Sequence, residues 1–375
     1  MVDTLIATVG ASLYVNISKD DELKKLYESE RLEELAEKLL DPKIKQENER
    51  MLGAEINSVE SIIKEGYIQE RKNLYFFISD TKTGEKVGKL LEAYFKYSKD
   101  SSFEKVEVKK IERLNDEKRE DFKRYGLKNL VKSMSAILKE HGPSTIINAT
   151  GGYKAQIAFA LALGQGMNIP VYYQFERFPT VIKLPPLPLS LDYKLYLDYL
   201  YFIDQFDDEG FIEYTPEIAN QYKVLDERLT PLFDIGNLDN LKYIELNPMG
   251  QVFVESAKQF FNLTKKDQLS LKHRKNDLIM QYSNSEEHSK KIILEYNLED
   301  KFKKLDFIEK VYVKGGNEKE VSGKRNQVKI FGDEIKIVLN TKKGTLYLGV
   351  STTAENPEEM LLAKEKIEEF INDNF

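Results

Sequence analysis

Apolar and polar positions in the first half of the chain follow two alternating periods. Continuous β-prone runs predict buried strands at residues 4–9, 73–81, 106–111, 145–148 and 169–175. Apolar residues at helical spacing predict helices at residues 19–48, 53–64, 86–97, 122–141 and 155–163. Strands that alternate with helices build a doubly wound parallel sheet, so we expect an α/β fold for this half.

The middle of the chain changes character. Residues 179–188 are rich in proline and should be extended, and an aromatic helix at 193–206 follows them, so we place the first domain at residues 1–205. Residues 206–284 hold short helices around 243–253 and resemble a winged-helix-like linker. A DNA reader needs a basic recognition helix, and the helix expected at 215–222 carries only Glu217 as a charge. A structural or partner-docking linker is therefore favoured.

The last segment, residues 285–375, has the pattern of a small α+β domain. A helical run covers 290–305, and a final amphipathic helix covers 357–372. Between them we expect strands at 310–313, 327–331, 334–339 and 345–350, with turns at 315–316, 332–333 and 342–344. The pattern predicts helices packed on an antiparallel meander.

Polar turns follow three of the strands predicted in the first half. They are Gly10, Ala11 and Ser12 after the first strand, Ser79, Asp80 and Thr81 after the second, and the run from Asn148 to Lys154 after the fourth. In doubly wound sheets ligands bind beyond the carboxyl ends of the strands. These turns should therefore meet at one edge of the sheet.

The run after the fourth strand has the features of an anion site. Gly151 and Gly152 let a ligand approach the backbone, the next helix presents unpaired N–H groups, and Lys154 adds a full positive charge. Asn148 and Thr150 supply further polar groups beside them. No G-x-G-x-x-G follows the first strand and no P-loop motif is present, so neither a dinucleotide nor a P-loop nucleotide site is predicted.

Composition narrows the chemistry. The 375 residues carry a net charge of −7 and include only three histidines and no cysteine. The absence of cysteine excludes disulfides, thiolate zinc sites and a cysteine nucleophile. Residues 1–10 lack the basic start of a signal peptide, and polar residues and Pro170 interrupt the longest apolar stretch, 155–173. We expect a cytoplasmic protein that does not enter a membrane.

Residues 8–13, 79–81, 148–154 and the later 184–188 together resemble the CRISPR-associated Rossmann-fold (CARF) sensor domain of type III CRISPR systems. The resemblance covers about residues 1–205. It implies a Rossmann-like sheet in a homodimer that binds a cyclic oligoadenylate activator, with cyclic tetra-adenylate favoured. It also implies ligand contacts from the three polar turns. Some members of the family cleave their ligand slowly, and Lys154 would then stabilise the developing charge.

The C-terminal segment lacks the complete signatures of two usual effectors of such sensors. The HEPN ribonuclease signature needs an arginine a few residues before a histidine, and none of His141, His273 or His288 satisfies it. Glu334 and Lys336 fit part of a metal-dependent PD-(D/E)xK nuclease motif, but the preceding strand offers no acid. That nuclease stays open as an alternative.

Basic residues are dense in this segment, which is a cue for RNA binding in an acidic protein. They are Lys301, Lys303, Lys304, Lys310, Lys314, Lys319, Lys324, Arg325, Lys329, Lys336, Lys342 and Lys343. A solvated surface is the competing interpretation.

The size, the order of elements and the hairpin at 328–339 resemble the RelE-type toxin fold. The resemblance implies metal-independent cleavage of messenger RNA on the ribosome, with catalytic roles for Lys324, Arg325, Lys329 and Lys336. The family's later arginine falls near Thr352, so its role has no counterpart here. We therefore expect a ligand-activated endoribonuclease without a cofactor. The alternatives are the metal-dependent nuclease and a ligand-responsive regulator without nuclease activity.

Overall fold

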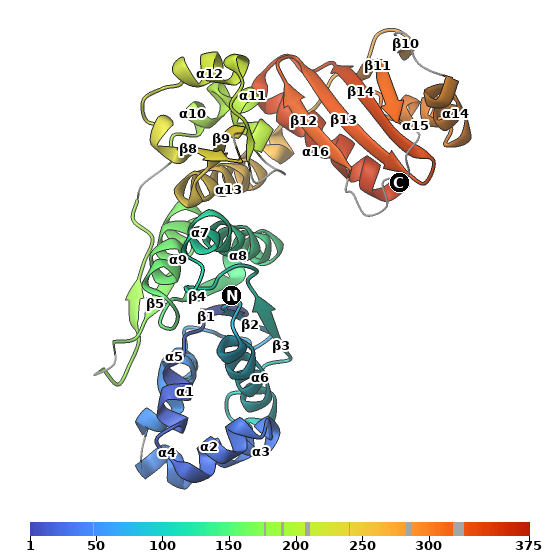
Figure 1. Cartoon of the computed structure of the whole chain (residues 1–375). Helices are drawn as coiled ribbons and strands as arrows, with labels where there is room; N and C mark the ends of the chain where they lie inside the picture. The colour runs from blue at the N-terminus through green and yellow to red at the C-terminus, as the bar shows by residue number, and fades with distance from the viewer. Residues whose placement is uncertain are drawn as a thin grey trace. The chain divides into compact units, whose positions relative to one another are not determined.

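The structure is a computed structural model of the whole chain, shown in Figure 1. It describes residues 1–47, 49–175, 178–188, 191–206, 211–239, 241–282, 287–317 and 326–375. The first of two compact units holds Met1–Leu191 with Leu246–Gln259, and the second holds Asp192–Glu245 with Phe260–Phe375. The division expected at residues 205 and 284 stays a prediction.

A six-stranded sheet forms the centre of the first unit, in the order β3, β2, β1, β4, β5, β6. The strands are β1 (Thr4–Thr8), β2 (Asn73–Ile78), β3 (Lys105–Lys110), β4 (Thr145–Asn148), β5 (Val171–Tyr173) and β6 (Ile182–Leu184). β1 to β5 are parallel, and β6 runs antiparallel to β5. Because β1 lies between β2 and β4, the winding reverses there, and the switch point falls between the ends of β1 and β4.

Helices cover both faces of this sheet, as Figure 1 shows. They are α1 (Ser12–Ile17), α2 (Asp21–Glu28), α3 (Leu32–Leu39), α4 (Pro42–Glu47), α5 (Gly53–Lys64), α6 (Lys82–Tyr97), α7 (Arg119–Asp121), α8 (Leu127–His141) and α9 (Lys154–Gly166), with a π-helical turn at Phe122–Gly126. Apolar residues of α1, α2, α3, α5 and α6 pack with Leu5 and Phe76. Those of α8 and α9 pack with Ile6 and Tyr75, because neighbouring strand residues point to opposite faces.

The second unit contains two sheets. Its strands are β7 (Ile212–Glu213), β8 (Phe233–Leu238), β9 (Leu241–Leu246), β10 (Ile279–Tyr282), β11 (Ile308–Asn317), β12 (Gln327–Phe331), β13 (Glu334–Thr341) and β14 (Gly344–Thr352). One sheet has the order β7, β9, β8 and the other the order β10, β11, β14, β13, β12.

The helices of the second half are short except for two. They are α10 (Tyr193–Asp198), α11 (Leu200–Ile203), the 3-10 turn η4 (Asp204–Phe206), α12 (Pro216–Lys223), α13 (Pro248–Thr264), α14 (Glu287–Glu295), α15 (Leu298–Lys303) and α16 (Pro357–Asn374). α13 contributes residues to both units. No helix among the described residues is long and apolar enough to cross a membrane.

The mixed α/β architecture and the parallel sheet of the first half are confirmed. The prediction missed β6, which forms only three pairs at the sheet edge inside the proline-rich segment 179–188. It also missed the β8 and β9 strands, because it placed short helices there.

Several details of the C-terminal prediction were wrong. The sheet is no simple meander, since β11 pairs with β14 and not with β12, and the unpredicted β10 pairs in parallel with β11. Residues 315–316 form no turn: they lie in β11, where the register shifts beside Gly315. The helix expected at 290–305 is broken at Asn297, whose φ of 48° is left-handed. The hairpin of β12 and β13 is confirmed.

Candidate functional site

The turns after β1 and β4 touch at the switch point of the first unit. A Cβ atom added to Gly10 would lie 2.7 Å from the Gly152 nitrogen, and one added to Gly151 would lie 2.8 Å from the Thr8 carbonyl oxygen. The Thr8 hydroxyl donates to the Gly151 carbonyl oxygen at 2.6 Å. Only glycine allows this approach, so the structure brings together Gly10, Gly151 and Gly152 as the sequence predicts.

A buried carboxylate that the sequence did not reveal fills the space beside these turns. Glu55 of α5 is 3% exposed. It accepts hydrogen bonds from the backbone nitrogens of Gly10 at 3.1 Å, Ser12 at 3.3 Å and Leu13 at 3.1 Å. The Ser12 hydroxyl also donates to it, and Ala11 lies exposed beside them. The N-terminus of α1 is thus already occupied by an anion of the protein itself.

The polar residues of the β4 turn form an internal chain of hydrogen bonds. The Asn148 amide donates to the Ser58 hydroxyl at 2.7 Å and accepts from the Thr150 hydroxyl at 2.6 Å. Thr150 in turn accepts from the backbone nitrogen of Gln174 at 3.0 Å. These contacts fix the position of the turn.

The start of α9 brings an exposed lysine to this edge. Gly152 has a φ of 101°, a conformation that favours glycine, and the Lys154 side chain is exposed. The Tyr153 hydroxyl donates to Asp116 at 2.8 Å. Burial, together with the Asp116 carboxylate, raises the pKa of Tyr153 to about 12, so its hydroxyl stays a donor at neutral pH. The Tyr153 backbone nitrogen donates to the Gln156 side chain at 2.7 Å, so the Lys154 ammonium and the N–H groups of the first turn of α9 are the groups that suit a phosphate.

The β2 turn has mainly structural contacts. Asp80 accepts from the backbone nitrogen of Arg113 at 3.0 Å and lies 3.4 Å from the Lys110 ammonium. The Thr81 hydroxyl accepts from the Gly84 nitrogen at 3.0 Å and caps α6, and it lies 2.9 Å from the Ser79 hydroxyl. The ligand roles of Ser79, Asp80 and Thr81 stay a prediction.

In the second unit, two of the predicted catalytic lysines lie directly opposite each other. Lys329 of β12 pairs in register with Lys336 of β13, so both project from the same, partly exposed face of the sheet. The Lys329 ammonium donates to the Gln205 carbonyl oxygen at 3.2 Å. The other two predicted catalytic residues, Lys324 and Arg325, lie outside the described residues.

Lys336 has an unusual environment for a lysine. Its ammonium lies 3.0 Å from the centre of the Phe331 ring. Burial lowers the pKa of Lys336, and the nearby Lys314 ammonium lowers it further. Lys314 crosses Gly349, where an added Cβ would lie 2.6 Å from the lysine Cε atom. Lys314, Lys329 and Lys336 together are called the basic face here.

The metal-dependent alternative depends on Glu334. This carboxylate accepts from the Lys314 ammonium at 2.9 Å, and Asp333 is exposed in the turn before it. Among the described residues, no group of three or more histidine and acidic side chains is placed to hold a metal ion.

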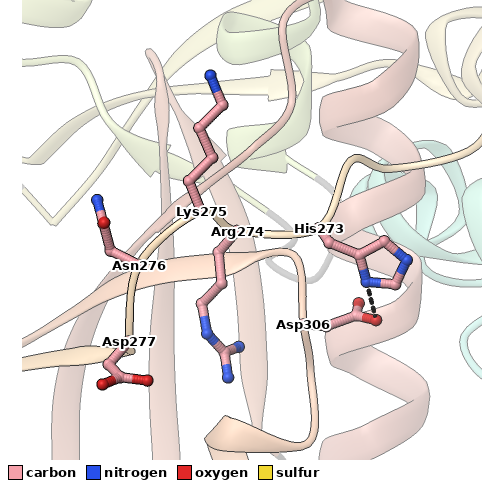
Figure 2. A pocket seen from close by; sticks show the side chains of 6 residues that line it. All are labelled: His273, Arg274, Lys275, Asn276, Asp277 and Asp306. Carbon is pink, nitrogen blue, oxygen red and sulfur yellow. Dashed lines mark ion pairs between the residues drawn. The ribbon is translucent and has the colours of Figure 1, made fainter.

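A cavity of about 530 Å³ lies elsewhere in the second unit and was not predicted. Its lining is formed by His273, Arg274, Lys275, Asn276, Asp277 and Asp306 (Figure 2). His273 Nδ1 lies 2.6 Å from an Asp306 carboxylate oxygen. The Arg274 guanidinium donates to two backbone carbonyl oxygens, of Leu305 and Lys303. Figure 2 shows Lys275 pointing away from the His273 and Asp306 pair. The positively charged side chains of the cavity therefore do not converge on that pair.

Comparison with known proteins gives one family match. The model of a family described as CRISPR-associated protein (Cas_APE2256) matches residues 50–187, which lie within the first unit. No curated protein sequence matches the chain. A solved structure, Can2 from Sulfobacillus thermosulfidooxidans in complex with cyclic tetra-adenylate, is similar at 10% identity and a TM-score of 0.23, over 73% of this chain and 68% of that one. A TM-score this low does not establish a shared fold.

Proposed function

We propose that the first unit is a sensor for a cyclic oligoadenylate in type III CRISPR defence and that the second unit is an RNA-cutting domain controlled by it. The observation that carries the sensor proposal is the exposed Lys154 at the start of α9, beside the touching turns of β1 and β4. The CRISPR-associated family match supports it, because residues 50–187 include α5, α9 and the β4 turn.

Cyclic tetra-adenylate is the favoured ligand. Its ring of phosphates needs donors arranged around a symmetry axis, and a homodimer would present two copies of each edge. Each copy offers N-terminal N–H groups of α9 and the exposed Lys154 ammonium. Gly10, Ser12 and Ala11 would border the ligand, while Glu55 fixes their backbone.

Slow cleavage of the ligand is the second activity proposed for this edge. A ribose 2′-hydroxyl would attack the adjacent phosphorus, the 5′-oxygen would leave with a proton, and a 2′,3′-cyclic phosphate would remain. Lys154 would stabilise the negative charge that develops on the phosphate oxygens. This reaction limits the lifetime of the activator.

Replacing Lys154 with alanine should weaken binding of cyclic tetra-adenylate by about tenfold or more, since a charge-assisted phosphate contact is lost in each copy. Calorimetric titration at two salt concentrations measures this, and the loss should shrink at high salt. Lys89→Ala is the matched control, because Lys89 is exposed on α6 in the same unit. Equal affinities of the Lys154→Ala protein and the wild type would contradict the site.

The basic face is proposed as the RNA-cutting site. Cleavage of RNA by its own 2′-hydroxyl needs a base for that hydroxyl and cations for the phosphate, and it needs no metal. Burial and the Lys314 ammonium lower the pKa of Lys336, which favours it as the base, and Lys329 pairs with it in register as the phosphate-binding cation. Lys324 and Arg325 are proposed as further cations, and messenger RNA on the ribosome as the substrate.

A further inference from the structure

The second unit contains a buried ion pair that the proposed reaction does not use. The Lys364 ammonium of α16 lies 2.6 Å from one carboxylate oxygen of Asp204 in η4. Their side chains are 3% and 1% exposed. Lys364 also lies 3.5 Å from the Glu368 carboxylate, which is 38% exposed.

The second carboxylate oxygen of Asp204 reaches the C-terminal sheet. It accepts a hydrogen bond from the backbone nitrogen of Ile330 in β12. β12 is the edge strand of the five-stranded sheet, so Asp204 satisfies a donor that faces away from β13. The next residue, Gln205, accepts from the ammonium of Lys329 through its carbonyl oxygen. One short turn therefore holds both the backbone and the lysine of β12.

Stability alone is a poor explanation for this pair. Removing two charges from water costs free energy that their attraction often fails to recover, and well-packed apolar residues serve a core equally well. A carboxylate at position 204 does what an apolar side chain cannot: it accepts from Lys364 and from the Ile330 N–H at once. The pair thus fixes one placement of η4 on β12.

We propose that Asp204 and Lys364 are positioning residues that set the place of the Lys329 ammonium on the basic face. The task of Lys329 in this statement rests on the proposed RNA cleavage. The placement of its ammonium does not, since it follows from the contacts of Asp204 and Gln205.

Lysine acylation measures the placement directly. The full-length protein is treated briefly with acetic anhydride, and the extent of modification at each lysine is read by mass spectrometry. In Asp204→Ala/Lys364→Met, both charges and the acceptor for Ile330 are gone, and Lys329 acylation should rise about fivefold, the effect of one lost hydrogen bond. Asp204→Asn/Lys364→Met keeps an amide oxygen for Ile330, and its Lys329 should stay close to wild type. Lys310, exposed on β11, is the internal reference.

Unchanged Lys329 acylation in Asp204→Ala/Lys364→Met would overturn the proposal. Should that protein fail to fold, amide hydrogen exchange in the wild type decides: Ile330 should exchange slowly, and rapid exchange would refute the contact.

RNA cleavage separates this proposal from the proposed function. With ligand present, Asp204→Ala/Lys364→Met should lose kcat with little change in KM, because the substrate binds but the cation is misplaced. The Asn/Met protein should cut at close to the wild-type rate. If Lys329 acylation shifts as expected but neither the wild type nor the two variants cut RNA, the positioning role would be supported and the RNA-cutting function rejected. A higher KM with an unchanged kcat would contradict the positioning role.

Discussion

Replacing Glu55 with alanine is expected to lower the free energy of unfolding by about 3–5 kcal/mol. The Glu55 carboxylate accepts from three backbone nitrogens, of Gly10, Ser12 and Leu13, and from the Ser12 hydroxyl. Glu55 is only 3% exposed, so water cannot easily replace the hydrogen bonds that its carboxylate accepts. The buried Leu13 donor and the partly buried Gly10 and Ser12 donors would lose their acceptor.

Urea unfolding followed by circular dichroism measures this loss. Glu65→Ala is the matched control, because Glu65 is the exposed C-cap residue of the same helix, α5. Its effect should stay within about 0.5 kcal/mol. The Glu55→Ala protein should also bind cyclic tetra-adenylate more weakly, because the Gly10 to Leu13 turn is no longer held. A loss no larger than that of Glu65→Ala would contradict the anchoring role of Glu55.

Replacing Lys336 with alanine is expected to reduce RNA cleavage by about 100-fold or more, the range for loss of a general base. The Lys336→Ala protein should be nearly as stable as the wild type. Because the fold lowers the pKa of Lys336, the protonated form is disfavoured in the native state, and this cost is present at neutral pH and disappears as pH rises toward the ordinary lysine pKa. The melting temperature should therefore change little.

The pH dependence of cleavage provides a second readout. Wild-type activity should rise with pH and level off below the ordinary lysine pKa of 10.5, in keeping with the lowered pKa of Lys336. Lys310→Ala is the control, since it removes an exposed lysine from the same sheet. Equal losses in the two variants would indicate that Lys336 acts only through its charge.

Periodicity predicted those parts of the fold that depend on local signals. The five parallel strands and the β12 and β13 hairpin each combine a β-prone run with clear turn residues, and both were found. β6 and β10 were missed, because each is a short strand that is defined by its pairing with β5 or β11, and no local pattern reveals that pairing.

The candidate site was predictable only where glycines mark it. Gly10, Gly151 and Gly152 meet as expected, since close backbone contact demands glycine. Glu55 gave no signal, because a single glutamate in an amphipathic helix usually faces water. Asp204 and Lys364 are 160 residues apart, and only the folded chain shows that they pair.

RNA cleavage in a translating extract, with and without cyclic tetra-adenylate, tests the central claim most directly. The wild type should cut messenger RNA on ribosomes only when the ligand is added, while Lys154→Ala should require much more ligand and Lys336→Ala should cut far more slowly at every ligand concentration. Cutting that is independent of the ligand, or tight ligand binding with no cutting, would contradict the account.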